Sequence, residues 1–447
     1  MALTTISDTK STNSKPILGF WKIWNMSFGF LGVQIGYSLQ TSNTSGILSA
    51  IGADVHHLSY FWLAAPIAGL IVQPIIGLSS DKTWTRLGRR IPFILGGAII
   101  SALAMFFMPN SEHFAQLLPP VFFGATMLLL MDTSFNITMQ PFRGLVSDMV
   151  PDSQRNIGYS IQTFLINTGG IIGALLPTIL TWIGMANKPL EGNKVAPTVI
   201  WAYYIGGAVL LLSVLWTAFR TREYPPEEYA KYNNLEKEEV KMSFPDLLRN
   251  IPSTMWQLAV TQFFSWFALF LMWVYTTNGI AQTVWHCLIT DSTSADFNAA
   301  RNWTGVLTAV YGVIAALFSL IMTPLADKFG RKNTYALCLL VGGIGLISMI
   351  FITDKNLLFI PMIGVGIAWA AILAMPYAIL ASSLPARQTG VYMGIFNATI
   401  TIPQIAAGLL GGLALMVVGE KAILVIGLAG VSMILAAVFA KTVIKNK

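Results

Sequence analysis

One carboxylate lies in the middle of a long apolar run, at Asp132 in the sequence Met127-Leu-Leu-Leu-Met-Asp132-Thr-Ser-Phe-Asn136. The other acidic residues, of 20 in the chain, fall in predicted loops or at the ends of apolar runs. A charge at the centre of a bilayer costs roughly 3 kcal/mol, and removal from water favours the protonated form of a carboxyl. No Lys or Arg lies in the middle of an apolar run to pair with it. We therefore predict that Asp132 takes up and releases a proton; the alternative is a neutral Asp that holds two helices together.

Neutral amides are the second group of side chains that could take part in function. Gln34, Tyr37 and Gln40 recur at i, i+3 and i+6 in the first apolar run, and Asn136 follows Asp132 by one helical turn. An amide both donates and accepts hydrogen bonds, as the hydroxyls of a sugar require. Each residue has interhelical packing as its alternative role. The predicted substrate-binding set is Gln34, Tyr37, Gln40, Asn136, Gln162, Asn167, Trp273, Asn278, Gln282, Tyr311, Asn397 and Gln404.

The composition defines the elements that must position these groups. Of 447 residues 55% are hydrophobic and 11% are charged, whereas soluble domains carry about 25% charged residues. The chain is therefore predicted to be an all-α polytopic membrane protein. Cys287 and Cys338 lack metal-ligand spacing, and no catalytic or phosphate-binding motif occurs in a suitable context. We expect no enzyme activity, no metal and no cofactor other than a transported proton.

Twelve apolar segments are long enough to cross about 30 Å of hydrocarbon. They lie near residues 19–42, 59–79, 92–109, 117–142, 157–184, 197–218, 254–286, 303–325, 334–352, 357–381, 389–417 and 421–440. The longest polar stretch divides them six and six. The predicted organisation is a tail at 1–16, a six-helix half at 17–219, a linker at 220–253, a second six-helix half at 254–440 and a tail at 441–447.

The basic residues indicate the orientation in the membrane. With the N-terminus inside, 22 of the 27 Lys and Arg residues lie in cytoplasmic segments. Cytoplasmic loops of membrane proteins carry such an excess, so both termini are predicted to be cytoplasmic. The net charge of +7 follows from this topology, and nucleic acid binding is not needed to explain it.

A repeat relates the two halves. The loop Gly77-Leu-Ser-Ser-Asp81-Lys82, followed by Arg86-Leu-Gly88-Arg89-Arg90, matches Asp327-Lys328-Phe-Gly330-Arg331-Lys332 further along the chain. Arg155-Asn-Ile-Gly158 is similarly matched by Arg387-Gln-Thr-Gly390. Two equivalent halves are typical of transporters that rock about a site at the interface between the halves.

The acidic residues of the repeated loops are suited to hold the halves together. Asp accepts charge-assisted hydrogen bonds from Arg or from the N-terminus of a neighbouring helix. We predict a cytoplasmic gate that opens when the halves rotate; the alternative is that the basic residues only fix the topology. The gate residues are Gly77, Asp81, Arg86, Gly88, Arg89, Arg90, Asp327, Gly330 and Arg331.

The repeated loop resembles the signature of the major facilitator superfamily. Further motifs resemble the sucrose/proton symporter family, closely over residues 28–180 and more loosely in the second half. They are Gly32-Val-Gln34-Ile-Gly36-Tyr37-Ser-Leu-Gln40, Ala65-Pro66-Ile-Ala-Gly69-Leu-Ile-Val-Gln73-Pro74, the loop from Ser80 to Ile94, and Leu130-Met-Asp132 with Asn136, Pro141 and Arg143. The resemblance implies the major facilitator fold, a proton carried by Asp132, and a requirement for Arg143.

Arg143 and Asp132 are eleven residues apart, about 16 Å along a helix, so they share a face but cannot touch. We expect Arg143 near the cytoplasmic mouth, against Asp148 or the gate. One departure concerns span 7, where plant members carry Asp-Trp-x-Gly-Arg-Glu. Here the stretch is Thr276-Thr-Asn278-Gly-Ile-Ala-Gln282-Thr283, which has no charge.

The predicted function is import of a neutral disaccharide with a proton by alternating access. Sucrose, maltose or a related α-glucoside is the expected substrate, since no intramembrane cation is present to bind an anion. We expect a monomer in a bacterial inner membrane, with the sugar, the proton and the bilayer as partners. The alternatives are another cation-coupled glycoside carrier, a drug/proton antiporter, a uniporter, or a sugar sensor that no longer transports.

Overall fold

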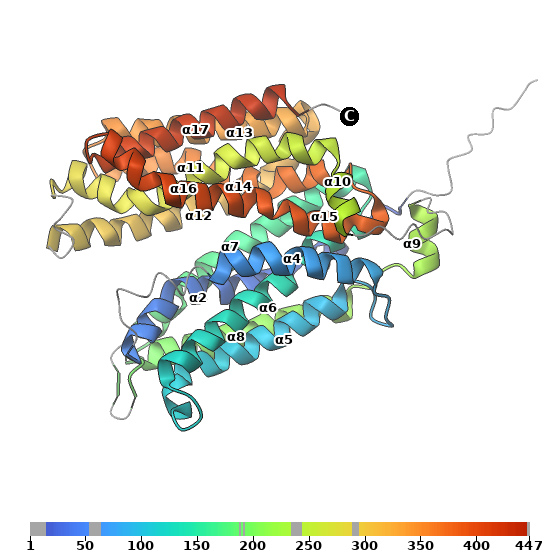
Figure 1. The fold of residues 1–447 in the computed structure, drawn as a ribbon, viewed down its shortest axis with the longest axis horizontal. Helices are drawn as coiled ribbons and strands as arrows, with labels where there is room; N and C mark the ends of the chain where they lie inside the picture. The colour runs from blue at the N-terminus through green and yellow to red at the C-terminus, as the bar shows by residue number, and fades with distance from the viewer. Residues whose placement is uncertain are drawn as a thin grey trace, which may run out of the picture.

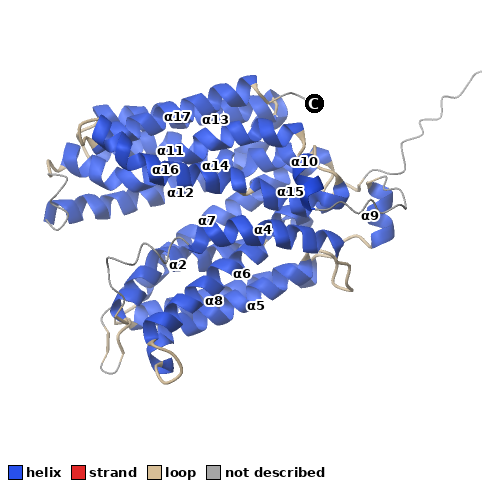
Figure 2. Cartoon of the chain, viewed as in Figure 1, coloured by secondary structure: helices blue, strands red, loops and turns tan. Residues whose placement is uncertain are grey.

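The computed structural model describes residues 15–52, 64–186, 189–190, 193–233, 244–287 and 295–444. Most of the N-terminal tail and the start of the second predicted span lie outside these residues. The described chain consists of helices and loops, apart from one isolated β-bridge between Thr85 and Gly88 (Figure 2). The expected all-α fold is confirmed.

The first half of the chain forms one helical bundle, coloured blue to green in Figure 1. Its helices are α1 (Phe20–Ser27), α2 (Gly29–Ala50), α4 (Ala64–Lys82), α5 (Ile91–Phe107), α6 (Pro120–Met149), α7 (Arg155–Trp182) and α8 (Pro197–Arg220), with the 3₁₀ turns η2 (Met108–Phe114) and η3 (Asp152–Gln154). The linker contains two short helices, α9 (Pro226–Tyr232) and α10 (Phe244–Arg249).

The second half forms the other bundle, coloured yellow to red. Its helices are α11 (Ser253–Val284), α12 (Ala295–Phe329), α13 (Arg331–Ser348), α14 (Phe359–Ala381), α15 (Thr389–Phe396), α16 (Ala398–Val417) and α17 (Ala422–Thr442), with η4 (Met349–Phe351), η5 (Asn356–Leu358) and η6 (Ala386–Gln388). The predicted span 389–417 is therefore two helices that meet at Asn397. Pro403 lies inside the second helix and has no N–H to donate.

Ten helical segments of the described residues are long and apolar enough to cross a membrane. The helices α2 and α4 occupy the places of the first two predicted spans but are not among the ten, and both carry polar residues that the sequence marks as functional. Twelve crossings therefore remain a prediction.

The two bundles meet at one end and diverge toward the other (Figure 1). We call the end that carries the repeated loops, 77–90 and 323–332, the loop end; the C-terminus lies there as well. Between the halves, α4 packs against α15 and α7 packs against α12. A Cβ atom at Gly77 would collide with the backbone of Gly390, and one at Gly394 would collide with the backbone of Gln73. The absence of side chains at these positions is what lets α4 and α15 approach so closely.

The substitution Gly394→Leu is expected to separate α4 from α15 at the loop end. Overpacking of this kind typically costs 1–3 kcal/mol, so uptake by the predicted transporter, whose cycle is expected to re-form this contact, should fall severalfold. Gly412→Leu is the control, because a Cβ at Gly412 of α16 has no atom within 4 Å. Equal uptake rates of the two variants in reconstituted vesicles would show that the close approach of α4 and α15 is not required for uptake.

Candidate functional site

Asp132 lies near the middle of α6 with only 2% of its surface exposed. Its Oδ1 accepts a hydrogen bond from Nε2 of Gln40, a fully buried residue of α2. Asp132 takes part in none of the ion pairs of the described residues. The carboxyl is thus held by a neutral amide in the interior of the N-terminal bundle.

Two acceptor atoms of this pair have no partner. Oδ2 of Asp132 and Oε1 of Gln40 are both buried and make no hydrogen bond. An ionised carboxylate only accepts, whereas a protonated one adds an O–H donor. Leaving a buried acceptor unpaired costs about 1–3 kcal/mol. The arrangement therefore suits the protonated form of Asp132, which supplies a donor where two acceptors are unmatched.

Asn136 links this pair to α4. Its Nδ2 donates to the backbone carbonyl of Asp132 at 2.8 Å, and its Oδ1 accepts from Nε2 of Gln73 at 2.5 Å. A Cβ at Gly69 of α4 would lie 3.3 Å from Oδ1 of Asn136 and 3.1 Å from Nδ2 of Asn397. Asn136 of one half and Asn397 of the other therefore contact the same segment of α4. Gln73 was not among the predicted site residues.

Arg143 does not contact Asp148, contrary to our expectation. Its Nη1 donates to the backbone carbonyl of Leu373 in α14 at 3.0 Å, and its guanidinium lies 4.0 Å from the centre of the Tyr377 ring. The reason is that Asp148 is already bound by Arg90, with 2.8 Å between Nε and Oδ2. Arg143 thus bridges the two halves on the side of Asp132 that faces the loop end.

Aromatic side chains from the second half meet an amide from the first. Nε1 of Trp273 donates to the hydroxyl of Tyr311 at 3.1 Å. Nε1 of Trp369, on α14, donates to Oδ1 of Asn167, on α7, at 3.0 Å. The structure therefore brings together three of the predicted residues, Asn167, Trp273 and Tyr311, and adds Trp369.

Other predicted residues are engaged in packing. Gln282 donates to the carbonyl of Glu420 at 2.9 Å and accepts from the N–H of Ala422 at 2.8 Å, so it fastens the turn before α17. Gln162 is fully buried and donates to the carbonyl of Phe142 at 2.9 Å. For these two amides the geometry favours the packing alternative.

Of the four remaining predicted residues, two pack against neighbouring side chains or helices and two make no side-chain hydrogen bond to a described residue. Gln34 packs against α7, where a Cβ at Gly169 would lie 3.1 Å from its Cβ. The ring of Tyr37 stands edge-on to that of Phe135. Asn278 and Gln404 are half-buried and have no side-chain hydrogen bond to another described residue.

At the loop end, Asp81 joins the first repeated loop to the second half. Its carboxylate lies 2.6 Å from Nη2 of Arg89 and 2.7 Å from Nη2 of Arg90. It also accepts the N–H groups of Gly390 and Val391, at 2.9 and 2.8 Å, in the first turn of α15. These are charge-assisted hydrogen bonds to a helix N-terminus, the interaction that the motif predicts.

The same two arginines also bind Asp148, which the sequence did not mark as a gate residue. Arg90 is fully buried and Arg89 is 2% exposed, so the two cations and the two carboxylates form a buried, neutral cluster. Arg86 is exposed and forms no ion pair with a described residue, so the structure leaves it outside this cluster.

The second repeated loop makes a smaller contact. Oδ1 of Asp327 accepts from Nδ2 of Asn156 at 2.7 Å, and Nε of Arg331 donates to Oδ1 of the same amide at 2.7 Å. Gly88 and Gly330 have φ values of +114° and +83°, a conformation that favours Gly. The recurrence of Gly in both loops therefore has a backbone cause.

The linker helix α9 covers the buried cluster. The hydroxyl of Tyr229 donates to the carbonyl of Ala386 at 2.5 Å and lies 3.2 Å from Oδ1 of Asp148, while its ring lies 4.7 Å from the guanidinium of Arg89. Glu223 accepts the N–H groups of Arg90 and Ile91, each at 2.8 Å. Burial raises the pKa of Glu223 above its ordinary value. The linker thus contributes to the contact between the halves.

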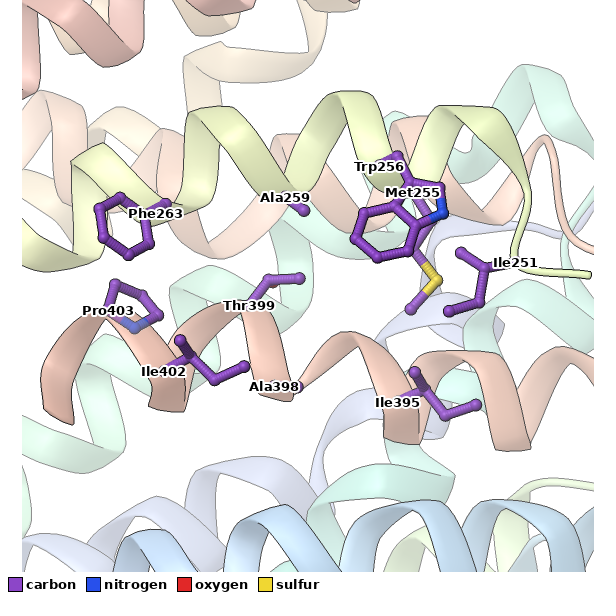
Figure 3. Close-up of a pocket in the computed structure, with 10 residues that line it drawn as sticks. All are labelled: Ile251, Met255, Trp256, Ala259, Phe263, Ile395, Ala398, Thr399, Ile402 and Pro403. Carbon is purple, nitrogen blue, oxygen red and sulfur yellow. The ribbon is translucent and has the colours of Figure 1, made fainter. Parts of the chain in front are cut away.

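A separate groove lies between α11 and the pair α15 and α16 (Figure 3). Figure 3 shows Met255, Trp256 and Phe263 on one side and Ile395 and Ile402 on the other. Thr399 is the only lining residue with a side-chain hydroxyl or amide. Most of the lining side chains are apolar, so the groove suits hydrocarbon better than it suits a sugar.

Two helical bundles joined through repeated loops, with a buried carboxyl and a set of amides between helices, are typical of a transporter of the major facilitator type. The family model described as MFS/sugar transport protein matches residues 47–419. The chain belongs to this family and is a multi-pass membrane protein that transports sugar rather than an enzyme.

Individual proteins agree with this assignment. The chain is similar to the sucrose transport protein SUT5 of rice, Oryza sativa subsp. indica, at 24% identity over 88% of this chain and 82% of the relative. It is also similar to the general alpha-glucoside permease of Schizosaccharomyces pombe, at 24% identity over 57% of this chain and 47% of the permease. Among solved structures, the transporter FucP in the outward conformation aligns with a TM-score of 0.70 at 16% identity, over 94% of this chain and 98% of FucP.

Proposed function

We propose that the protein imports a neutral disaccharide together with one proton, and that Asp132 carries the proton. The observation that carries this proposal is the buried Asp132 carboxyl, which among the described residues has an amide but no cation as its partner. The names of the similar proteins, sucrose transport protein and alpha-glucoside permease, support sucrose, maltose or a related α-glucoside as the substrate.

Protonation is expected to precede closure around the sugar. An ionised Asp132 would be a buried charge without a counter-ion, which is costly in a medium of low dielectric constant. The protonated side chain is neutral and supplies an O–H donor to a pair that has two unmatched acceptors. A ligand shifts a conformational equilibrium only through its different affinity for the two states, and we propose that protonation of Asp132 meets this condition.

The sugar is proposed to lie between the halves. Asn136 and Asn397 contact one segment of α4, and Asn136 is bonded to the backbone of Asp132, so sugar hydroxyls at Asn136 would be coupled to the proton carrier. Tyr37, Asn278 and Gln404 remain candidates, whereas Gln40 is reassigned to the proton step. The loop end is proposed to face the cytoplasm, as do both termini, in a bacterial inner membrane.

Uptake of radiolabelled sucrose and maltose into reconstituted vesicles tests the proposal. An inward gradient of one pH unit supplies about 1.4 kcal/mol per proton, so wild-type protein should concentrate its sugar about tenfold. Uptake that reaches the same plateau with and without the gradient would contradict proton coupling. Failure to take up either sugar would contradict the proposed substrate.

A further inference from the structure

Three indole rings from α11 and α14 pack edge to face in the second half. The ring centres of Trp266 and Trp369 are 5.6 Å apart, those of Trp273 and Trp369 are 5.8 Å apart, and those of Trp266 and Trp273 are 6.3 Å apart. The planes are inclined by 65° to 83°, as aromatic pairs prefer. We call these three residues the tryptophan cluster.

The N–H groups of the cluster differ in their partners. Trp273 donates to Tyr311 of α12, and Trp369 donates to Asn167 of α7 in the other half. Trp266 is only 6% exposed, and its Nε1 is buried and has no hydrogen-bond partner. Buried indole N–H groups are usually hydrogen-bonded. An unsatisfied donor therefore lies beside a ring, that of Trp273, which is 38% exposed.

The hydrogen-bond partners of the cluster are uncharged side chains. The hydrogen bonds that its members make run to a phenol and to an amide, and none of the ion pairs of the described residues includes a neighbour named here. An aromatic face with an adjacent N–H donor and amide suits a ligand that has an apolar face and hydroxyl groups. A pyranose ring has both, since its C–H face can lie on an indole while its oxygens accept hydrogen bonds.

We infer that the tryptophan cluster binds one glycosyl ring of the transported sugar, with the ring of Trp273 as the stacking surface and the N–H of Trp266 as a donor to a sugar oxygen. This inference rests on the proposed function and specifies where the second half holds the glycoside. Because Trp369 is bonded to Asn167 across the interface, a sugar ring at the cluster contacts the part of the protein where the halves meet.

Sugar binding to purified protein, measured by calorimetry with the sugar that the wild type transports, tests the inference. Trp273→Ala removes the stacking surface and is expected to weaken binding about tenfold. Trp266→Phe keeps an aromatic ring and removes only the N–H, with an expected loss of about fivefold. Trp256→Ala, on the same helix but 62% exposed in the groove of Figure 3, is the control and should bind like the wild type.

The uptake kinetics of the same variants supply a second readout. A lost sugar contact raises KM and the dissociation constant together, whereas a merely structural role lowers the melting temperature and leaves both constants unchanged in the folded fraction. If Trp273→Ala does not fold, Trp273→Leu and Trp266→Phe decide the question. Normal sugar binding by folded cluster variants would overturn the inference and leave the proposed function intact. Absence of glycoside binding by the wild type would overturn both.

Discussion

Replacement of Asp132 by Asn is expected to abolish proton-driven accumulation of sugar. Asn has nearly the shape of a protonated Asp but cannot release a proton, so the transporter would behave as if permanently protonated. The accumulation ratio under a gradient of one pH unit should fall from about ten to about one, while exchange of labelled sugar for unlabelled sugar continues. Uptake and exchange measured in the same vesicles check the prediction.

Two further variants sharpen this experiment. Asp354→Asn, at an exposed acid that precedes η5, is the control and should accumulate sugar normally. The double variant Asp132→Asn with Gln40→Glu exchanges the acid and the amide within the hydrogen-bonded pair. It should recover part of the accumulation if the pair is the unit that holds the proton. Full accumulation by Asp132→Asn alone would remove Asp132 as the carrier.

Replacement of Asp81 by Asn is expected to open the loop end. The change leaves Arg89 and Arg90 buried against a single carboxylate and weakens the hydrogen bonds to the first turn of α15. Removing one partner of a buried ion pair costs about 3–5 kcal/mol, which corresponds to a shift of at least a hundredfold in the equilibrium between closed and open loop ends.

Labelling of a cysteine at position 160 measures this shift. Ser160 is 4% exposed where α7 meets α12, at 3.2 Å from the hydroxyl of Thr323. In a background without Cys287 and Cys338, Ser160→Cys should react slowly with an impermeant maleimide added at the loop end, and much faster when Asp81→Asn is present. Asp152→Asn, at an acid whose side chain is 61% exposed, should change the rate little, since exposed pairs contribute about 0–1 kcal/mol. Slow labelling in both variants would show that the buried cluster does not hold the loop end closed.

The sequence predicted the helical fold because long apolar runs and the repeated loop motif are local features. The motif even indicated the kind of contact that Asp81 makes, since an acid at the end of a helix has few partners other than Arg and a helix N-terminus. The burial of Asp132 followed from its position in an apolar run. These features depend on residues close together in the chain.

Features that depend on distant parts of the chain were missed. Asp148 and Tyr229 join the buried cluster from α6 and the linker, and neither sequence context is distinctive. Gln282 was expected at the substrate, yet its amide fastens the turn before α17, because helical periodicity gives depth in the membrane but not the neighbour on each face. Gln40 was expected to bind sugar, and the sequence did not indicate that its amide donates to Asp132.

Movement of protons with sugar is the most direct test of Asp132 as the proton carrier. Vesicles that contain a pH-sensitive dye, with no pH gradient at the start, receive sucrose or maltose on the outside. We expect acidification of the interior by wild-type protein and none by Asp132→Asn, although sugar still enters the vesicles of the variant. Sugar-dependent acidification by Asp132→Asn at the wild-type rate would contradict the role of Asp132 as the proton carrier.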